Sequence, residues 1–340
     1  MMAQTFFLLS GLAIILIAAE LFTNGIEVFG RHFSFTQAVV GSIFAAVGTA
    51  LPETILPVVA IFFYRGQSAK NIGIGAILGA PFMLSTLAFF LVGLTVALAA
   101  LNKKRRFELR VEANSIKRDL SFFLVMYSLA VILPLFLGKA FLVPIAVILV
   151  FGYIVYAWMT FRGQSAEMEH SEEMYLWRLL KGANPKLFKG AAPFPVILTQ
   201  ITASLVVMIK GAHIFVGSLE HISLRFGINP LLFSLLLAPF ATELPEKFNS
   251  ITWIWKGRDT LAMGNITGAM VFQATFPVTV GLLFTDWHIK GMALFSAVLA
   301  MISSLVVLVM IIIRKRLSPL TMLFPGSLYL LYAVVIIVGR

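Results

Sequence analysis

The sequence predicts an all-α polytopic membrane protein with about ten transmembrane helices, arranged as two inverted five-helix repeats. Of its 340 residues, 60% are hydrophobic and 12% are charged, and the mean hydropathy is +0.97. A soluble domain carries roughly 25% charged residues. Apolar runs of about 20 residues, the length that crosses a bilayer, recur along the chain. A Pro-Glu motif in the first half also returns in the second half.

The apolar runs predict spans near residues 6–29, 37–64, 72–100, 119–137, 141–161, 195–219, 229–255, 260–285, 290–313 and 319–338. A β-barrel would show short alternating strands, and these runs do not alternate. No basic region precedes the first run, and its apolar pattern continues to Val28. We therefore expect a retained helix there rather than a signal peptide.

The longest polar connection, 162–194, is too short for a folded domain, so we expect a linker between repeats 1–161 and 195–340. Most of the 26 Lys and Arg residues fall in loops on the side of the membrane that holds this linker. The positive-inside rule makes that side cytoplasmic and places both termini outside. This bias also accounts for the net charge of +11 without nucleic acid as a partner. The compact loops suggest a prokaryotic inner membrane.

The internal repeat is the strongest organisational signal. One shift along the chain maps Glu53 onto Glu246 and Glu27 onto Glu220, and a slightly shorter one maps a glycine pair onto another. Each half has five predicted spans, so the second half enters the membrane from the opposite face. Secondary transporters built this way bind substrate at the midplane, where the repeats meet. The four glycines are Gly75, Gly79, Gly264 and Gly268, and we expect them to allow close helix packing.

The repeated motif reads Gly48-Thr49-Ala50-Leu51-Pro52-Glu53 in the first half and Ala241-Thr242-Glu243-Leu244-Pro245-Glu246 in the second. Residues four apart on a helix share one face, so each Thr lies on the face of its Glu. Each Pro removes a backbone hydrogen bond and frees a carbonyl oxygen one turn earlier. In lipid, such oxygens must be satisfied by protein, water or an ion.

Together the two segments offer two carboxylates, two hydroxyls and several carbonyls. Calcium takes about six to eight oxygen ligands, so a hard cation such as Ca²⁺ is the natural occupant. The plainer alternative is that each Glu pairs with a buried Lys and the prolines only kink the helices. Two intramembrane acids at repeat-related positions favour the cation site, because each costs ~2.5–3.5 kcal/mol to insert.

Three further residues leave alternatives open. Glu243 and Lys247 are spaced for a helical ion pair, and Glu243 could instead join the cation site. Lys210, near the middle of the sixth span, could partner Glu243 or fill a site in place of a cation.

These motifs resemble the cation/calcium exchanger superfamily, which includes sodium/calcium exchangers, and the resemblance covers nearly the whole chain. It implies that Glu53 and Glu246 are the central calcium ligands, with oxygens from Thr49 and Thr242. It also makes Asn265 and Gln273 polar neighbours on the eighth span. The chain departs from the family pattern where Ala50, Glu243, Ala269 and Met270 replace Ser or Asn, and where residues 75–83 lack the polar groups of the third span.

The predicted function is therefore a cation antiporter, exchanging Ca²⁺ for H⁺ or Na⁺ by alternating access around Glu53 and Glu246. Protons are slightly favoured as counter-ion, because the oxygens that form sodium sites in the family are depleted. An intramembrane enzyme is not expected, since the chain lacks cysteine and an H-E-x-x-H motif. No cofactor is expected beyond the transported cations. The alternative is a non-transporting or other-cation-specific membrane protein that keeps the exchanger fold.

Overall fold

The computed structural model describes residues 2–32, 51–103, 105–163, 173–184, 190–314 and 316–338. These residues are helical almost throughout, and they contain no strand beyond an isolated bridge between Leu109 and Leu317. The helices are α1 (Met2–His32), α4 (Leu51–Phe62), α5 (Gln67–Met83), the π-helical η2 (Leu84–Ala88), α6 (Phe89–Leu101), α7 (Ala113–Phe136), the 3-10 helix η3 (Lys139–Phe141), α8 (Leu142–Gly163), α9 (Tyr175–Ala183), α10 (Phe194–Arg225), α11 (Pro230–Thr242), α12 (Leu244–Trp255), α13 (Asp259–Gln273), α14 (Phe276–Phe284), α15 (Gly291–Arg314) and α16 (Pro319–Val338).

Eight helical stretches of the described chain are long and apolar enough to cross a membrane. They correspond to eight of the ten predicted spans. The other two predicted spans contain the Pro-Glu motifs. The span at 37–64 is described only from Leu51 onward, and the span at 229–255 is divided into α11 and α12. The count of ten and the inverted repeat therefore remain predictions, whereas the all-helical membrane class is confirmed.

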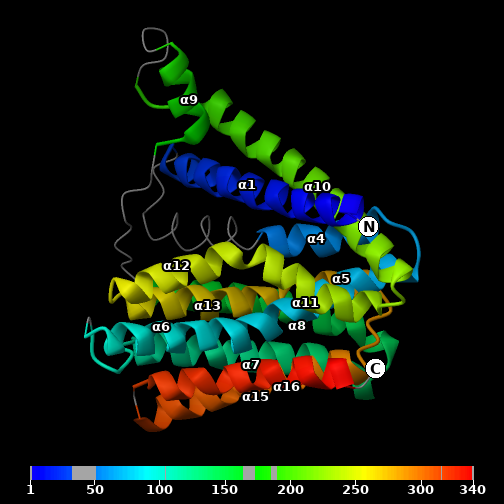
Figure 1. The fold of residues 1–340 in the computed structure, drawn as a ribbon, viewed down its shortest axis with the longest axis vertical. Coiled ribbons are helices and arrows are strands. Elements are labelled where there is room, and N and C mark those ends of the chain that lie inside the picture. Colours follow the sequence, from blue (N-terminus) through cyan, green and yellow to red (C-terminus); the bar gives the residue numbers. More distant parts are fainter. Residues whose placement is uncertain are drawn as a thin grey trace.

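The helices form a bundle with two distinct flanks. Helices α1 and α10 pack along each other on one flank, and α15 and α16 lie together on the opposite one (Figure 1). Between them lie α4, α5, α11 and α12, and the described parts of the two motifs lie in or next to α4, α11 and α12. Both termini lie at one end of the bundle, and the loop after α6 lies at the other end (Figure 1).

The tightest helix contact near the motifs joins α5 to α11. Pro239 cannot donate to the carbonyl of Leu235, so this oxygen is free to face a neighbouring helix. It approaches the backbone of Gly79 so closely that a Cβ added there would lie 2.1 Å from it. One turn away, the hydroxyl of Ser234 donates to the carbonyl of Ile72 at 2.7 Å. The absent Cβ of Gly79 thus lets α11 lie directly against α5.

The packing expected for the four glycines is confirmed for one pair only. A Cβ on Gly75 would lie 2.2 Å from the carbonyl oxygen of Leu231, so Gly75 belongs to the same close contact as Gly79. Gly264 meets no heavy atom of the described chain within 4 Å of such a Cβ, and Gly268 meets only Tyr156, at an ordinary 3.5 Å. No partner for this second pair is found among the described residues, which leave out 33–50, so its expected packing stays a prediction.

We predict that Gly79→Ala will lower the thermal stability of the purified protein, because α11 would have to move to admit the new methyl group. Overpacking of this kind costs about 1–3 kcal/mol. Gly182→Ala, at an exposed position of α9, is the control, and it is expected to be neutral or slightly stabilising, since Ala is the better helix former. Thermal unfolding in detergent measures both variants, and equal melting temperatures would contradict the role of Gly79.

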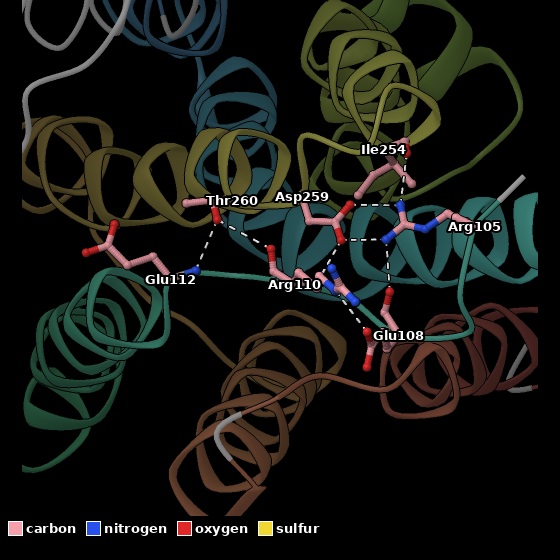
Figure 2. Close-up of polar contacts among 7 residues, drawn as sticks. All are labelled: Arg105, Glu108, Arg110, Glu112, Ile254, Asp259 and Thr260. Carbon is pink, nitrogen blue, oxygen red and sulfur yellow. Dashed lines mark hydrogen bonds and ion pairs between the residues drawn. The ribbon is translucent and has the colours of Figure 1, made fainter.

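The loop between α6 and α7 ties the start of α13 to the rest of the bundle (Figure 2). The guanidinium of Arg105 forms two hydrogen bonds to the carboxylate of Asp259, one of them at 2.8 Å, and also donates to the carbonyl of Ile254 at 2.9 Å. The backbone N–H of Arg110 donates to Asp259 at 2.8 Å. The side chain of Asp259 is only 1% exposed. This buried ion pair fixes the loop that joins α12 to α13.

The same loop carries a second, exposed ion pair. Arg110 donates to the carboxylate of Glu108 at 2.9 Å, and Arg316 lies 3.6 Å from it. The hydrogen bond from Arg110 and the two positive charges lower the pKa of Glu108. Loops predicted to lie on one side of the membrane therefore meet at one end of the bundle. Which side of the membrane this end faces remains a prediction.

The linker contains a short helix, α9, that docks onto α1 and α10. The first N–H groups of a helix have no partner inside it. Asn24 of α1 accepts from the N–H of Tyr175 at 3.0 Å, and Gln200 of α10 accepts from that of Leu176 at 2.8 Å. Gln200 also donates to Asn24 at 3.0 Å. The two helices of this flank thus hold α9 by its first turn.

Candidate cation-binding site

Glu53 lies in the first turn of α4 and is buried, with 5% of its surface exposed. It lines a small pocket together with Thr242, at the end of α11, and with residues of α5. The walls of the pocket stand too close together to admit a water molecule. The structure therefore brings together one acidic residue of the first motif and one hydroxyl residue of the second. The two residues are 189 positions apart in the sequence, and only the fold places them at the same pocket.

The pocket wall that α5 provides is apolar. Ala76 and Ala80 face the pocket, and Leu56 and Ala238 complete its apolar part. Methyl groups cannot coordinate a cation, so α5 contributes no side-chain ligand at these two positions. The side-chain oxygens that line the pocket come from Glu53 of α4 and Thr242 of α11. Thr242 is held in place there by a hydrogen bond of 3.2 Å from its hydroxyl to the carbonyl of Ala238.

The second motif breaks the helix. Helix α11 ends at Thr242, α12 begins at Leu244, and Glu243 caps both of them. Pro245 lies in the first turn of α12, where its missing N–H costs nothing. The sequence predicted a helix loosened around the acid, and the structure shows a break at Glu243. Such breaks are tolerated at membrane depth only where the backbone is buried in protein or lines a cavity.

Glu243 forms a buried ion pair with Lys247. The Lys247 Nζ lies 3.1 Å from the Glu243 Oε2, and the two side chains are 4% and 0% exposed. The same Nζ contacts the sulfur of Met83 on α5 at 3.0 Å. Of the two partners considered for Glu243, the structure selects Lys247, and it places Lys210 on the exposed surface of α10. The prediction that Lys210 could pair with Glu243 was therefore wrong.

The two polar residues expected on the eighth span do not line the Glu53 pocket. Asn265 is half-buried, and its amide donates to the Ser250 hydroxyl of α12 at 3.4 Å. Gln273 is the last residue of α13 and is 1% exposed. Its side-chain oxygen has no hydrogen-bond partner within the described chain. Both residues lie on the helix that follows the second motif, as the resemblance implies.

Two of the predicted ligands lie outside the described residues. These are Thr49 and the side chain of Glu246, of which only the backbone, in α12, is described. The described residues alone hold no group of three His, Cys, Asp or Glu side chains that could bind a metal ion. The four-ligand set of Glu53, Glu246, Thr49 and Thr242 therefore stays a proposal.

The sequence interpretation overlooked a further buried acid. Asp119 of α7 is 2% exposed and accepts a hydrogen bond from Thr267 of α13 at 2.8 Å and one from Tyr156 of α8 at 3.2 Å. Arg118 pairs with it at 3.2 Å. These contacts tie three helices together, so we interpret Asp119 as structural. The position of Asp119 inside a long apolar helix was the signal that could have revealed it.

The chain belongs to the sodium/calcium exchanger protein family, whose model matches residues 3–162 and 196–338. It is therefore a membrane transporter of the exchanger type and not an enzyme. The matched residues include both Pro-Glu motifs and leave out most of the linker with α9.

Similar proteins agree with this assignment. An uncharacterized membrane protein of Methanocaldococcus jannaschii is 26% identical over 303 residues, which cover 89% of this chain and 88% of the relative. The crystal structure of an H⁺/Ca²⁺ exchanger, CAX, matches 98% of this chain and 82% of its own, with a TM-score of 0.69 and 18% identity. The sodium-calcium exchanger NCX_Mj matches 98% of both chains, with a TM-score of 0.59 and 20% identity. At these identities the structural matches establish the fold.

Proposed function

We propose that the protein is a secondary antiporter that moves Ca²⁺ across the membrane in exchange for H⁺ or Na⁺. The observation that carries the proposal is the burial of Glu53 in a pocket shared with Thr242, at the point where α4, α5 and α11 meet. A carboxylate buried inside a bundle of membrane-spanning helices is costly to hold there, so such a residue is a candidate for an ion pathway. Membership of the exchanger family and the fold shared with CAX and NCX_Mj support a cation as the cargo.

In this proposal Glu53 and Glu246 are the central ligands, and Thr49 and Thr242 add oxygens. Two carboxylates balance the charge of one divalent cation, and four to six further oxygens would complete a calcium shell of about six to eight. The described pocket is closed, so it must widen toward one side of the membrane at a time to admit the ion. Opening in turn to the two sides is the alternating access expected of a repeat-based transporter.

Of the two counter-ions, H⁺ is favoured over Na⁺. The α5 wall of the pocket presents Ala76 and Ala80, which supply no oxygen for a separate sodium ion. A carboxylate can release its cation by taking up a proton and needs no further ligand to do so. Both counter-ions would then compete with Ca²⁺ for the same acids.

Calcium uptake into proteoliposomes tests this function. The purified protein is reconstituted, and uptake of labelled Ca²⁺ is followed under an outward H⁺ gradient and, separately, under an outward Na⁺ gradient. We expect uptake under the H⁺ gradient to exceed that in protein-free vesicles and to collapse when an ionophore removes the gradient. Uptake driven by Na⁺ alone would reverse the choice of counter-ion.

The alternative is a membrane protein that keeps the exchanger fold without transporting. It is favoured by one observation, the buried Lys247, whose positive charge lies next to the second motif. Absence of flux under both gradients for Ca²⁺, Sr²⁺, Mn²⁺ and Mg²⁺, in protein that is folded and monodisperse, would support this alternative and overturn the antiporter.

A further inference from the structure

The buried ion pair of Glu243 and Lys247 stands beside the Glu53 pocket. Its ammonium contacts Met83, which follows the pocket residue Ala80 by one turn of α5. Glu243 directly follows Thr242, which lines the same pocket. The ion pair and the pocket thus lie against the same stretch of α5, and both belong to the break between α11 and α12.

Three groups of the described chain surround the ammonium. A carboxylate oxygen lies at 3.1 Å, the soft Met83 sulfur at 3.0 Å, and the face of the Phe240 ring at 6.0 Å. An aromatic face attracts cations at that distance. A buried Lys is expensive in a membrane, so its retention beside Glu243 requires a compensating partner, which the carboxylate supplies.

The formal charges of the three acids in and beside the two motifs match a single divalent ion only when Lys247 is counted with them. Glu53, Glu243 and Glu246 carry three formal negative charges, and Lys247 cancels one of them. The two that remain match one Ca²⁺. Without the ammonium, the three acids would keep one more negative charge than a single Ca²⁺ balances, and a second, monovalent cation would be needed to balance it.

We propose that Lys247 is a tethered cation. Its ammonium holds, as part of the protein, the position beside Glu243 that a free alkali cation would otherwise occupy, so the site takes up a divalent cation without a co-bound Na⁺ or K⁺. Lys247 is then a specificity-determining residue of the site. The inference rests on the proposed function for the identity of the cargo, but the tethered cation itself can be tested without any transport.

The test compares thermal unfolding of the detergent-purified protein in NaCl, in KCl and in choline chloride, at equal ionic strength and constant pH. Wild type is expected to melt at the same temperature in all three. Lys247→Met, which keeps the volume and removes the charge, is expected to melt higher in NaCl or KCl than in choline. The shift should reach roughly 4 °C at a cation concentration about 100 times its Kd.

Two further variants serve as controls. Lys247→Arg keeps a positive charge and should behave as wild type. The double variant Glu243→Gln/Lys247→Met removes both charges and should again be indifferent to alkali cations. Indifference of Lys247→Met itself, or an equal alkali dependence of the double variant, would overturn the tethered cation.

If Lys247→Met cannot be purified, Glu243→Gln tests the same charge balance from the other partner. It leaves an ammonium without its carboxylate and should weaken Ca²⁺ binding at least roughly tenfold, because the added positive charge repels the ion. Unchanged Ca²⁺ affinity would overturn the proposal. Failure of the wild type to bind or carry Ca²⁺ would instead contradict Ca²⁺ as the transported ion. The dependence of the variants' melting temperatures on Na⁺ or K⁺ would still decide the role of Lys247.

Discussion

Glu53→Gln is expected to abolish cation uptake in proteoliposomes while leaving the protein folded. Glutamine keeps the volume of the side chain and can hydrogen-bond, but it removes the negative charge that a buried divalent ion requires. Leaving a buried charge without its partner costs about 3–5 kcal/mol. Since about 1.4 kcal/mol corresponds to a factor of ten, we expect affinity for the cation to fall by roughly two to three and a half orders of magnitude.

The measurement is labelled Ca²⁺ uptake at a concentration near the wild-type half-saturation point, with equal amounts of reconstituted protein. Glu112→Gln is the matched control, because it makes the same substitution at an exposed residue that precedes α7. It should transport as wild type does. Glu246→Gln should reproduce the loss seen at Glu53. Near-normal uptake by Glu53→Gln would remove Glu53 from the site and with it the mechanism proposed above.

Arg105→Gln is expected to cause the largest loss of stability of any single substitution in the loops. It would leave the buried carboxylate of Asp259 without its charge partner and would break the bonds to Ile254 and Glu108. Removal of one partner from a buried ion pair costs about 3–5 kcal/mol. The start of α13 would then be held to the loop between α6 and α7 by the backbone hydrogen bonds of Arg110 and Glu112 alone (Figure 2).

The matched control lies in the same loop. Arg110→Gln breaks an ion pair with Glu108 whose Arg side chain is 70% exposed, and exposed pairs contribute only about 0.2–1 kcal/mol. The melting temperature should therefore fall clearly for Arg105→Gln and barely for Arg110→Gln. The double variant Arg105→Met/Asp259→Leu should be more stable than either of its single variants, because no uncompensated charge remains. Equal effects of the two Arg variants would contradict the role of the buried pair.

The sequence by itself determined the class of protein and led to the proposal for the cation site. Composition and the length of the apolar runs predicted a helical membrane protein, and eight runs correspond to helices of the structure. The spacing of Glu243 and Lys247 also predicted their ion pair as one of two options. These signals are local: they depend on residues within one or two helical turns, where the geometry of a helix decides which side chains meet.

The tertiary structure decided which residues meet across helices. Arg105 pairs with Asp259, which lies far along the chain, and Met83 contacts Lys247 from another helix. No local sequence pattern predicts either contact. The glycines show the same limit: no local pattern around Gly79 indicates that the backbone of α11, far along the chain, comes close to it. Contacts of this kind depend on how helices are placed in three dimensions, and the spacing of residues along one helix does not contain that information.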